Sequence, residues 1–78
     1  MAPMGRYIIE VHAFNESLQK VWVKVSERSL QLDAYTVAEI YSYNNPVQLY
    51  RVCDRHAIPS EQQYTYFQYG HCVLPIRT

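Results

Sequence analysis

The chain has 78 residues, and seven basic side chains balance seven acidic ones. A chain this short forms one domain and buries only about 60% of the surface it exposes when unfolded. Its basic residues are scattered, whereas nucleic-acid-binding proteins cluster them, so we do not expect direct DNA or RNA binding. Without a long apolar run or a secretory signal, residues 1–78 are expected to form one cytoplasmic domain with no membrane contact.

Residues 6–26 predict an antiparallel hairpin. Residues 6–14 are rich in β-forming side chains, and residues 19–26 alternate regularly between two faces. A turn-like Asn15-Glu16-Ser17 separates the two runs. The apolar face would contain Tyr7, Ile9, Val11, Ala13, Val21, Val23 and Val25, and the opposite face would contain Lys20, Trp22 and Lys24.

Helical spacing replaces this alternation after residue 29. One stripe would be formed by Leu30, Ala34, Val37, Ala38 and Tyr41. Asp33 is the expected N-cap, and a helix over residues 34–43 would make about three turns before Pro46 ends it. The small Ala34 and Ala38 would let this helix lie close to the valine face of the hairpin.

Strand character returns after Pro46. Residues 47–54 alternate with no purely apolar face, which predicts a partly exposed or edge strand, and residues 54–59 predict a loop. Residues 61–73 are ambiguous, because Ser60 with Gln63 matches a helix capping box while the following tyrosines favour a strand. We predict one strand from Gln63 to Leu74, with a bulge at Gly70 and with Pro75 closing it.

The resulting order is strand, strand, helix, strand, strand. It predicts an α+β domain of two layers, in which one helix crosses a face of an antiparallel four-stranded sheet. The other face of such a sheet is open and can carry function.

The cysteines and histidines are the candidates for metal binding, a disulfide or catalysis. A zinc site would need Cys53, His56, His71 and Cys72 to converge, but adjacent residues of a strand point to opposite faces, so no metal or other cofactor is expected. A disulfide between Cys53 and Cys72 is disfavoured in a cytoplasmic protein. Cys72 with His12 or His56 lacks an orienting group and a pocket, so we expect no catalytic residues and no enzyme.

Aromatic residues give the clearest functional signal. Eight tyrosines in 78 residues exceed what a small core accepts, since each buried hydroxyl needs a partner. Alternation also prevents the last three tyrosines of the chain from sharing one face. Tyrosine, tryptophan and arginine are enriched at protein interfaces. The candidate partner-binding residues are Tyr64, Tyr66, Tyr69, Trp22, Tyr43, Tyr50 and Arg55.

In size, in element order and in stretches such as RYIIEVHAF and QKVWVKV, the chain resembles small phage-encoded inhibitors of bacterial defence, such as anti-CRISPR proteins. The resemblance implies a protein that binds a surveillance complex or nuclease in the host cytoplasm and blocks its target DNA or its partner. It assigns no residue roles. The neutral charge departs from the acidic members that mimic DNA, so occlusion fits better than mimicry.

Two alternatives remain open at this point. The chain could be a homo-oligomeric structural or regulatory subunit, with the tyrosine face paired in a homodimer. It could also be a small metal-binding or nucleic-acid-binding module that uses the cysteines and histidines or the aromatic face.

Overall fold

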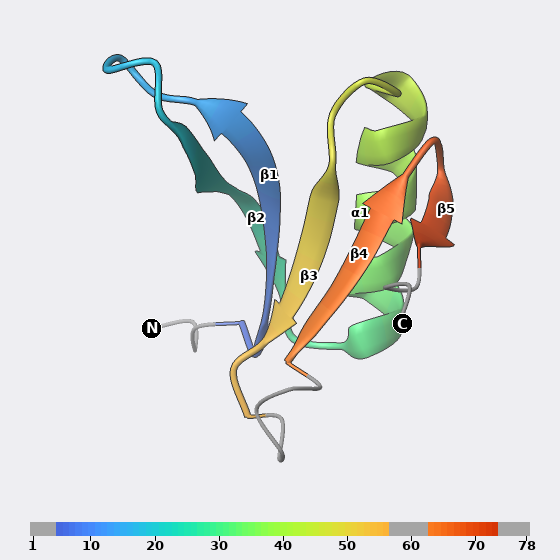
Figure 1. Cartoon of the computed structure of the whole chain (residues 1–78). Helices are drawn as coiled ribbons and strands as arrows, with labels where there is room; N and C mark the ends of the chain where they lie inside the picture. The colour runs from blue at the N-terminus through green and yellow to red at the C-terminus, as the bar shows by residue number, and fades with distance from the viewer. Residues whose placement is uncertain (1–4, 57–62, 74–78) are drawn as a thin grey trace, which may run out of the picture.

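The structure is a computed structural model, which describes residues 5–56 and 63–73 of the chain. Five strands and one helix follow one another in these residues (Figure 1). The elements are β1 (Tyr7–Phe14), β2 (Lys20–Arg28), α1 (Gln31–Asn44), β3 (Tyr50–Asp54), β4 (Tyr64–Gln68) and β5 (His71–Val73).

The strands form one sheet in the spatial order β2-β1-β3-β4-β5, and every neighbouring pair is antiparallel. Helix α1 lies across one face of β1, β3 and β4 and leaves the other face uncovered (Figure 1). The α+β plan and the antiparallel sheet are therefore confirmed, but the sheet has five strands where four were expected. Of the two alternatives for β3, the edge position is wrong, because β1 and β4 flank it, while the partly exposed side is present at Arg51 and Asp54.

The fifth strand arises from a tight turn. Tyr69 and Gly70 both have positive φ, 57° and 78°, and they connect Gln68 to its paired residue His71. Two central residues with positive φ match the twist of a two-residue hairpin, and glycine adopts this conformation without strain. The segment is extended, as predicted, but the single strand with a bulge is wrong. Ser60, residues 57–59, Leu74 and Pro75 lie outside the described residues.

Helix α1 begins one turn earlier than expected. Leu30 is the N-cap residue, with an extended backbone and no side-chain cap hydrogen bond, and its carbonyl accepts the Ala34 amide at 3.0 Å. Asp33 was the wrong choice of cap, because it lies inside the first turn, where its charge favours the helix dipole. At the other end, the backbone and side-chain nitrogens of Asn45 each donate to the Tyr41 carbonyl at 3.0 Å.

The core lies between α1 and the three central strands. Ile9, Val52 and Phe67 are almost completely buried there, and they meet Ala34 and Ala38, which have no exposed surface. The two alanines lie on the side of the helix that meets the sheet, as predicted, but they pack on the central strands, and the expected valine face of the hairpin is covered only in part, since Val23 is 43% exposed. Leu30 does not join this stripe, since it is 63% exposed.

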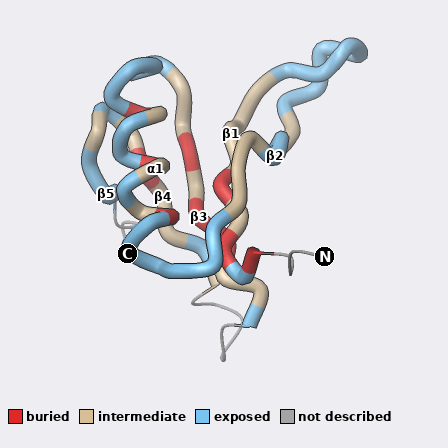
Figure 2. The backbone as a smooth tube through the Cα atoms, turned by 180° about the vertical axis from the view of Figure 1, so that it is seen from behind, coloured by how far each residue is buried: buried red, intermediate tan, exposed pale blue. Residues whose placement is uncertain are grey.

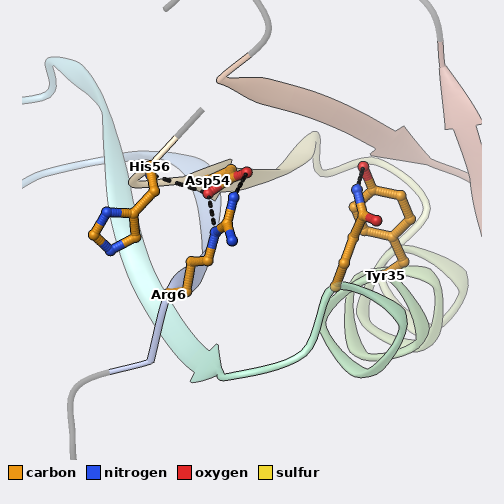
Figure 3. Close-up of polar contacts among 5 residues, drawn as sticks. Arg6, Tyr35, Asp54 and His56 are labelled. Atoms are coloured by element: carbon orange, nitrogen blue, oxygen red, sulfur yellow. Dashed lines mark hydrogen bonds and ion pairs between the residues drawn. The ribbon is translucent and has the colours of Figure 1, made fainter. Parts of the chain in front are cut away.

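Polar contacts also tie α1 to the sheet. The Tyr35 hydroxyl lies 3.0 Å from the Thr65 hydroxyl on β4. It also accepts a hydrogen bond from the Gln31 side-chain amide at 3.0 Å (Figure 3). Ser42 is fully buried, and its hydroxyl accepts the Gly70 amide at 3.0 Å. These bonds hold the helix over β4 and over the turn that follows it.

The β1–β2 hairpin departs from the expected alternation at one residue. Ile9 pairs with Ser26 while Glu10 pairs with Lys24, so Val25 is the extra residue of a bulge, and it still packs against the core. Beyond the β1–β3 pairing, the hairpin extends away from the rest of the sheet, and its tip is exposed (Figure 2).

Candidate functional site: the uncovered face of the sheet

Strand register determines which side chains lie on the uncovered face. Glu10 pairs with Lys24 and with Arg51, and Arg51 pairs with Tyr66, so these four residues form a row across four strands. Directly opposed residues of antiparallel strands share a face. The pair His12 and Trp22 forms the next row toward the hairpin tip. The row on the other side contains Ile8, Cys53 and Tyr64.

Arg51 connects these rows. Its guanidinium carbon lies 4.0 Å from the centroid of the Trp22 ring and 4.0 Å from that of the Tyr64 ring. Trp22 and Tyr64 belong to the rows on either side of Arg51, so both rings reach it diagonally. At this distance each ring attracts the cation through its quadrupole. Arg51 therefore bridges aromatic side chains of two strands, β2 and β4, that do not pair with each other.

Glu10 neutralises Arg51. The Arg51 Nε donates to Glu10 Oε1 at 2.7 Å, and the two side chains are only 14% and 20% exposed. A charge-assisted hydrogen bond in such a partly dry position is stronger than the same bond in water. The ion pair thus fixes the guanidinium between its two rings.

The remaining rings complete a continuous layer. His12 stacks on Trp22 with centroids 4.5 Å apart and planes 12° apart. Tyr66 lies 6.0 Å from Trp22 and 6.4 Å from Tyr64, both within the range of favourable ring pairs. We call the six residues of this layer the aromatic–arginine cluster: Glu10, His12, Trp22, Arg51, Tyr64 and Tyr66.

Of the seven residues expected to bind a partner, three belong to this cluster: Trp22, Tyr64 and Tyr66. Tyr43 and Tyr69 are 75% and 60% exposed but lie elsewhere, at the end of α1 and in the β4–β5 turn. Tyr50 is only 5% exposed and stacks on Tyr41, so the structure places it in the core. Burial of Tyr50 raises the pKa of its hydroxyl.

Arg55 directly follows the last residue of β3 and is not a member of the cluster. One of its guanidinium nitrogens is 3.9 Å from Glu27 Oε2, and its amide donates to the Arg6 carbonyl at 3.1 Å. Glu27 also pairs with Lys24 at 3.2 Å and accepts the Gly5 amide at 3.1 Å. The hydrogen bond with Lys24, followed by that from the Gly5 amide, lowers the pKa of Glu27.

A second ion pair, between Arg6 and Asp54, joins the ends of β1 and β3 beside Arg55. Arg6 donates to both carboxylate oxygens of Asp54, at 2.8 and 3.1 Å, and the His56 amide donates to the same carboxylate at 3.0 Å (Figure 3). The Arg6 hydrogen bond, helped by the His56 amide, lowers the pKa of Asp54, and Asp54 in turn raises the pKa of Arg6. This pair fastens the N-terminal strand to the end of β3.

The cysteines lie on opposite sides of the sheet. Cys53 shares the uncovered face with Tyr64, while Cys72 is exposed and pairs with the core residue Phe67. Both thiols are free, and burial, followed by the charge of Glu10, raises the pKa of Cys53. Within residues 5–56 and 63–73, no three His, Cys, Asp or Glu side chains gather as metal ligands, and no pocket indents the surface.

Sequence reasoning missed Glu10, His12 and Arg51 as members of the site. The signal was present, because alternation puts residues 10 and 12 on the face opposite the core residue Ile9. What alternation alone could not supply was the pairing of β1 with β3, which brings Arg51 beside Glu10.

Comparison with known protein families, with curated proteins and with solved structures found no match to this chain. Among the residues that the structure describes, no helix has the length and hydrophobicity needed to cross a membrane.

Proposed function

We propose that this protein is a small non-catalytic binding protein, and that its uncovered sheet face engages another protein. The observation that carries the proposal is the composition of the aromatic–arginine cluster. Tryptophan, tyrosine and arginine are the residues that most often dominate the binding energy of protein interfaces. Here one tryptophan, two tyrosines and one arginine lie together on a face that α1 does not cover. The Tyr66 ring centroid is 6.0 Å from that of Trp22 and 6.4 Å from that of Tyr64, and the Arg51 guanidinium carbon is 4.0 Å from the centroids of Trp22 and Tyr64.

Pre-organisation of the cluster supports the same proposal. Binding orders side chains, and this costs about 0.5–1.5 kcal/mol for each flexible side chain that becomes fixed. In the free protein, Arg51 is already held by Glu10 and by two rings, and Trp22 is already stacked on His12. A partner would therefore meet a surface whose arginine and tryptophan need little further ordering.

The resemblance to phage-encoded inhibitors directs the choice of partner. In this proposal, the protein binds a bacterial CRISPR surveillance complex, a nuclease or another defence complex in the host cytoplasm and occludes its working surface. The balanced charge of the chain favours occlusion through contact over imitation of DNA.

Phage plating on bacteria with active CRISPR interference tests this function. Wild-type protein should restore plating in at least one interference system, and it should co-elute with the purified effector complex of that system. Trp22→Ala, Tyr66→Ala and Tyr64→Ala should each lose inhibition while keeping the circular-dichroism spectrum of the wild type. Tyr64 is the most exposed of the three tyrosine and tryptophan rings in the cluster, so its variant serves even if another fails to fold.

Tyr43→Ala is the matched control, because it removes an exposed ring that lies outside the cluster. It should inhibit as well as wild type. Inhibition that survives all three cluster variants, or a wild type inactive in every system, would refute the proposal. Light scattering measures the molar mass in solution and so distinguishes this proposal from the homo-oligomer alternative. A wild-type dimer that Tyr66→Ala dissociates would assign the cluster to self-association.

A further inference from the structure

Strand β2 forms one edge of the sheet. Its inner side pairs with β1, and among the residues that the structure describes no strand pairs with its outer side (Figure 1). Such an edge presents a row of backbone donors and acceptors that another strand can take up. Lysines and bulges usually protect an edge from pairing, and β2 contains both. Any strand that pairs with β2 must therefore accommodate them.

The backbone of β2 shows which residues can bond to an added strand. The Asn15 amide donates to the Gln19 carbonyl at 2.9 Å, so Gln19 directs its backbone groups toward β1. These groups alternate in direction along a strand, so those of Val23 also point to β1, while those of Trp22 and Lys24 point outward. An added antiparallel strand would hydrogen-bond to Trp22 and Lys24.

The outer edge also leaves apolar surface exposed on the side of α1. Val21, Val23 and Val25 lie on that side, but Val23 is still 43% exposed, because α1 lies mainly over the central strands. A second β2 strand, antiparallel to the first, would bring the same three valines beside these. The apolar side of β2 is thus complementary to itself.

Charge restricts the registers in which two β2 strands can pair. Opposed residues of antiparallel strands share a face, so a two-fold axis must pass through one residue of β2. An axis through Trp22 sets Lys20 opposite Lys24 of the second copy, and an axis through Lys24 sets that residue opposite itself. Like charges directly opposite one another destabilise a sheet. An axis through Val21 pairs only three residues, since β2 begins at Lys20, and an axis at Val25 or beyond falls on or past the bulge.

An axis through Val23 meets none of these conflicts. Each Trp22 then lies opposite Lys24 of the second copy on the uncovered face, where an aromatic ring attracts an ammonium group. Farther from the axis, the bulge sets two residues of one strand against one of the other, so Lys20 comes opposite Glu27. These two residues share the uncovered face and have opposite charges. Both lysines and the bulge are therefore accommodated in this register.

We propose that the protein forms a two-fold dimer, in which the β2 strands of two copies pair antiparallel about Val23. The two five-stranded sheets join into one continuous sheet. Because the axis is normal to the sheet, both helices lie on one side and both aromatic–arginine clusters on the other. The inference does not depend on the proposed function, but it gives that function two copies of its binding surface on a single face.

A charge at the axis tests the dimer. Light scattering should give wild type the mass of two chains. Val23→Lys sets two lysines opposite each other and should give the mass of one chain, with an unchanged circular-dichroism spectrum because Val23 is partly exposed. Val73→Lys is the matched control and should remain dimeric. It makes the same change at a valine that is 40% exposed on β5, the other edge of the sheet.

An engineered disulfide tests the register. Opposed residues of an antiparallel pair have Cα atoms about 4.5–5.5 Å apart, a separation that a disulfide spans. Cys72→Ser first removes the exposed native thiol. In that background, Val23→Cys should form a covalent dimer under mild oxidation. Val21→Cys should not, because the two copies of that residue would lie roughly 13 Å apart along the paired strands.

Several results would overturn the dimer. One is a wild type with the mass of one chain up to its solubility limit, and another is a dimer that Val23→Lys leaves intact. If Val23→Lys does not fold, the disulfide decides, and a Val23→Cys protein that stays uncrosslinked overturns the proposal. Tyr66→Ala should remain dimeric, since a dimer that it dissociates has its contact at the cluster. None of these measurements uses phage plating, so failure of the dimer leaves the proposed function intact.

Discussion

The two faces of the sheet differ in the residues that form them and in the interactions that hold those residues in place. The covered face presents Ile9, Val52 and Phe67 to two alanines of α1, and these side chains are almost completely removed from water. The uncovered face presents rings and a neutralised arginine, all partly exposed. The first face gains its energy from burial, whereas the second gains little for folding and holds its side chains in place through contacts with one another.

Adjacent residues of β4 show how sharp this division is. Phe67 pairs with Tyr50 and points into the core, while Tyr66 pairs with Arg51 and points to the uncovered face. Both are large aromatic residues, and one step along the strand separates them. Comparing them therefore isolates the effect of the face from the effect of the residue type.

The largest effect is expected for Phe67→Ala. Truncation of a fully buried phenylalanine costs about 3–5 kcal/mol, which is comparable with the whole stability of a small domain. Urea denaturation followed by circular dichroism should show the variant largely unfolded without denaturant. Tyr66→Ala should lower the free energy of unfolding by less than about 1.5 kcal/mol, because its ring is only half-buried.

Equal losses for the two variants would show that the faces do not differ as described. Phe67→Leu keeps most of the buried volume and should recover part of the stability, which separates loss of packing from misfolding.

A smaller effect is expected when the Glu10–Arg51 pair is broken. Glu10→Gln leaves the guanidinium of Arg51 without its countercharge in a site where it is only 14% exposed, and should cost about 1–3 kcal/mol. Arg51→Met alone leaves Glu10 unpaired, while the double variant removes both charges. In a double-mutant cycle measured by urea denaturation, the double variant should lose less stability than the sum of the single losses. Strict additivity would mean that the ion pair does not organise the uncovered face.

The smallest effect is expected from acid, and it concerns the ion pair between Arg6, which precedes β1, and Asp54 at the end of β3. The pKa of Asp54 is lowered in the folded protein, chiefly by Arg6, so its stabilisation is complete above the unfolded pKa of about 3.9. It is lost as pH falls further and the folded carboxylate takes up its proton. The urea midpoint should therefore decrease below about pH 4. Asp54→Asn should show a shallower decrease, and an identical profile would argue against the Arg6 pair as a stabilising contact.

Much of the fold could be predicted from local pattern. Strand alternation identified the hairpin, and the two small residues Ala34 and Ala38 identified the side of the helix that meets the sheet. The pattern failed where backbone conformation overrode residue preference. Tyrosine seldom adopts positive φ, so Tyr69 gave no sign of a turn, and only Gly70 marked the position that ends β4. Likewise, Val25 reads as a regular strand residue although it is the bulge.

The candidate site was predictable in part. Alternation assigned Trp22 to the face opposite the valines and separated Tyr66 from Tyr69, and the structure puts Trp22, Tyr64 and Tyr66 together. Tyr50 was beyond such reasoning, because its strand has mixed faces and only the position of β3 between β1 and β4 buries it. Long-range pairing decides these cases, and one sequence contains no direct record of it.

The strand order has a consequence for how the chain folds. Each hairpin joins strands that are close in the sequence, and such contacts form within microseconds. The β1–β3 pairing instead joins Tyr7 to Asp54 across most of the chain, and contacts of this separation pay a loop-closure cost that slows folding. Trp22 on β2 and Arg51 on β3 lie on opposite sides of the β1–β3 pairing. A chain arrested before β1 pairs with β3 can therefore form the three described hairpins and the contact of Arg51 with Tyr64, but it lacks the contact of Arg51 with Trp22.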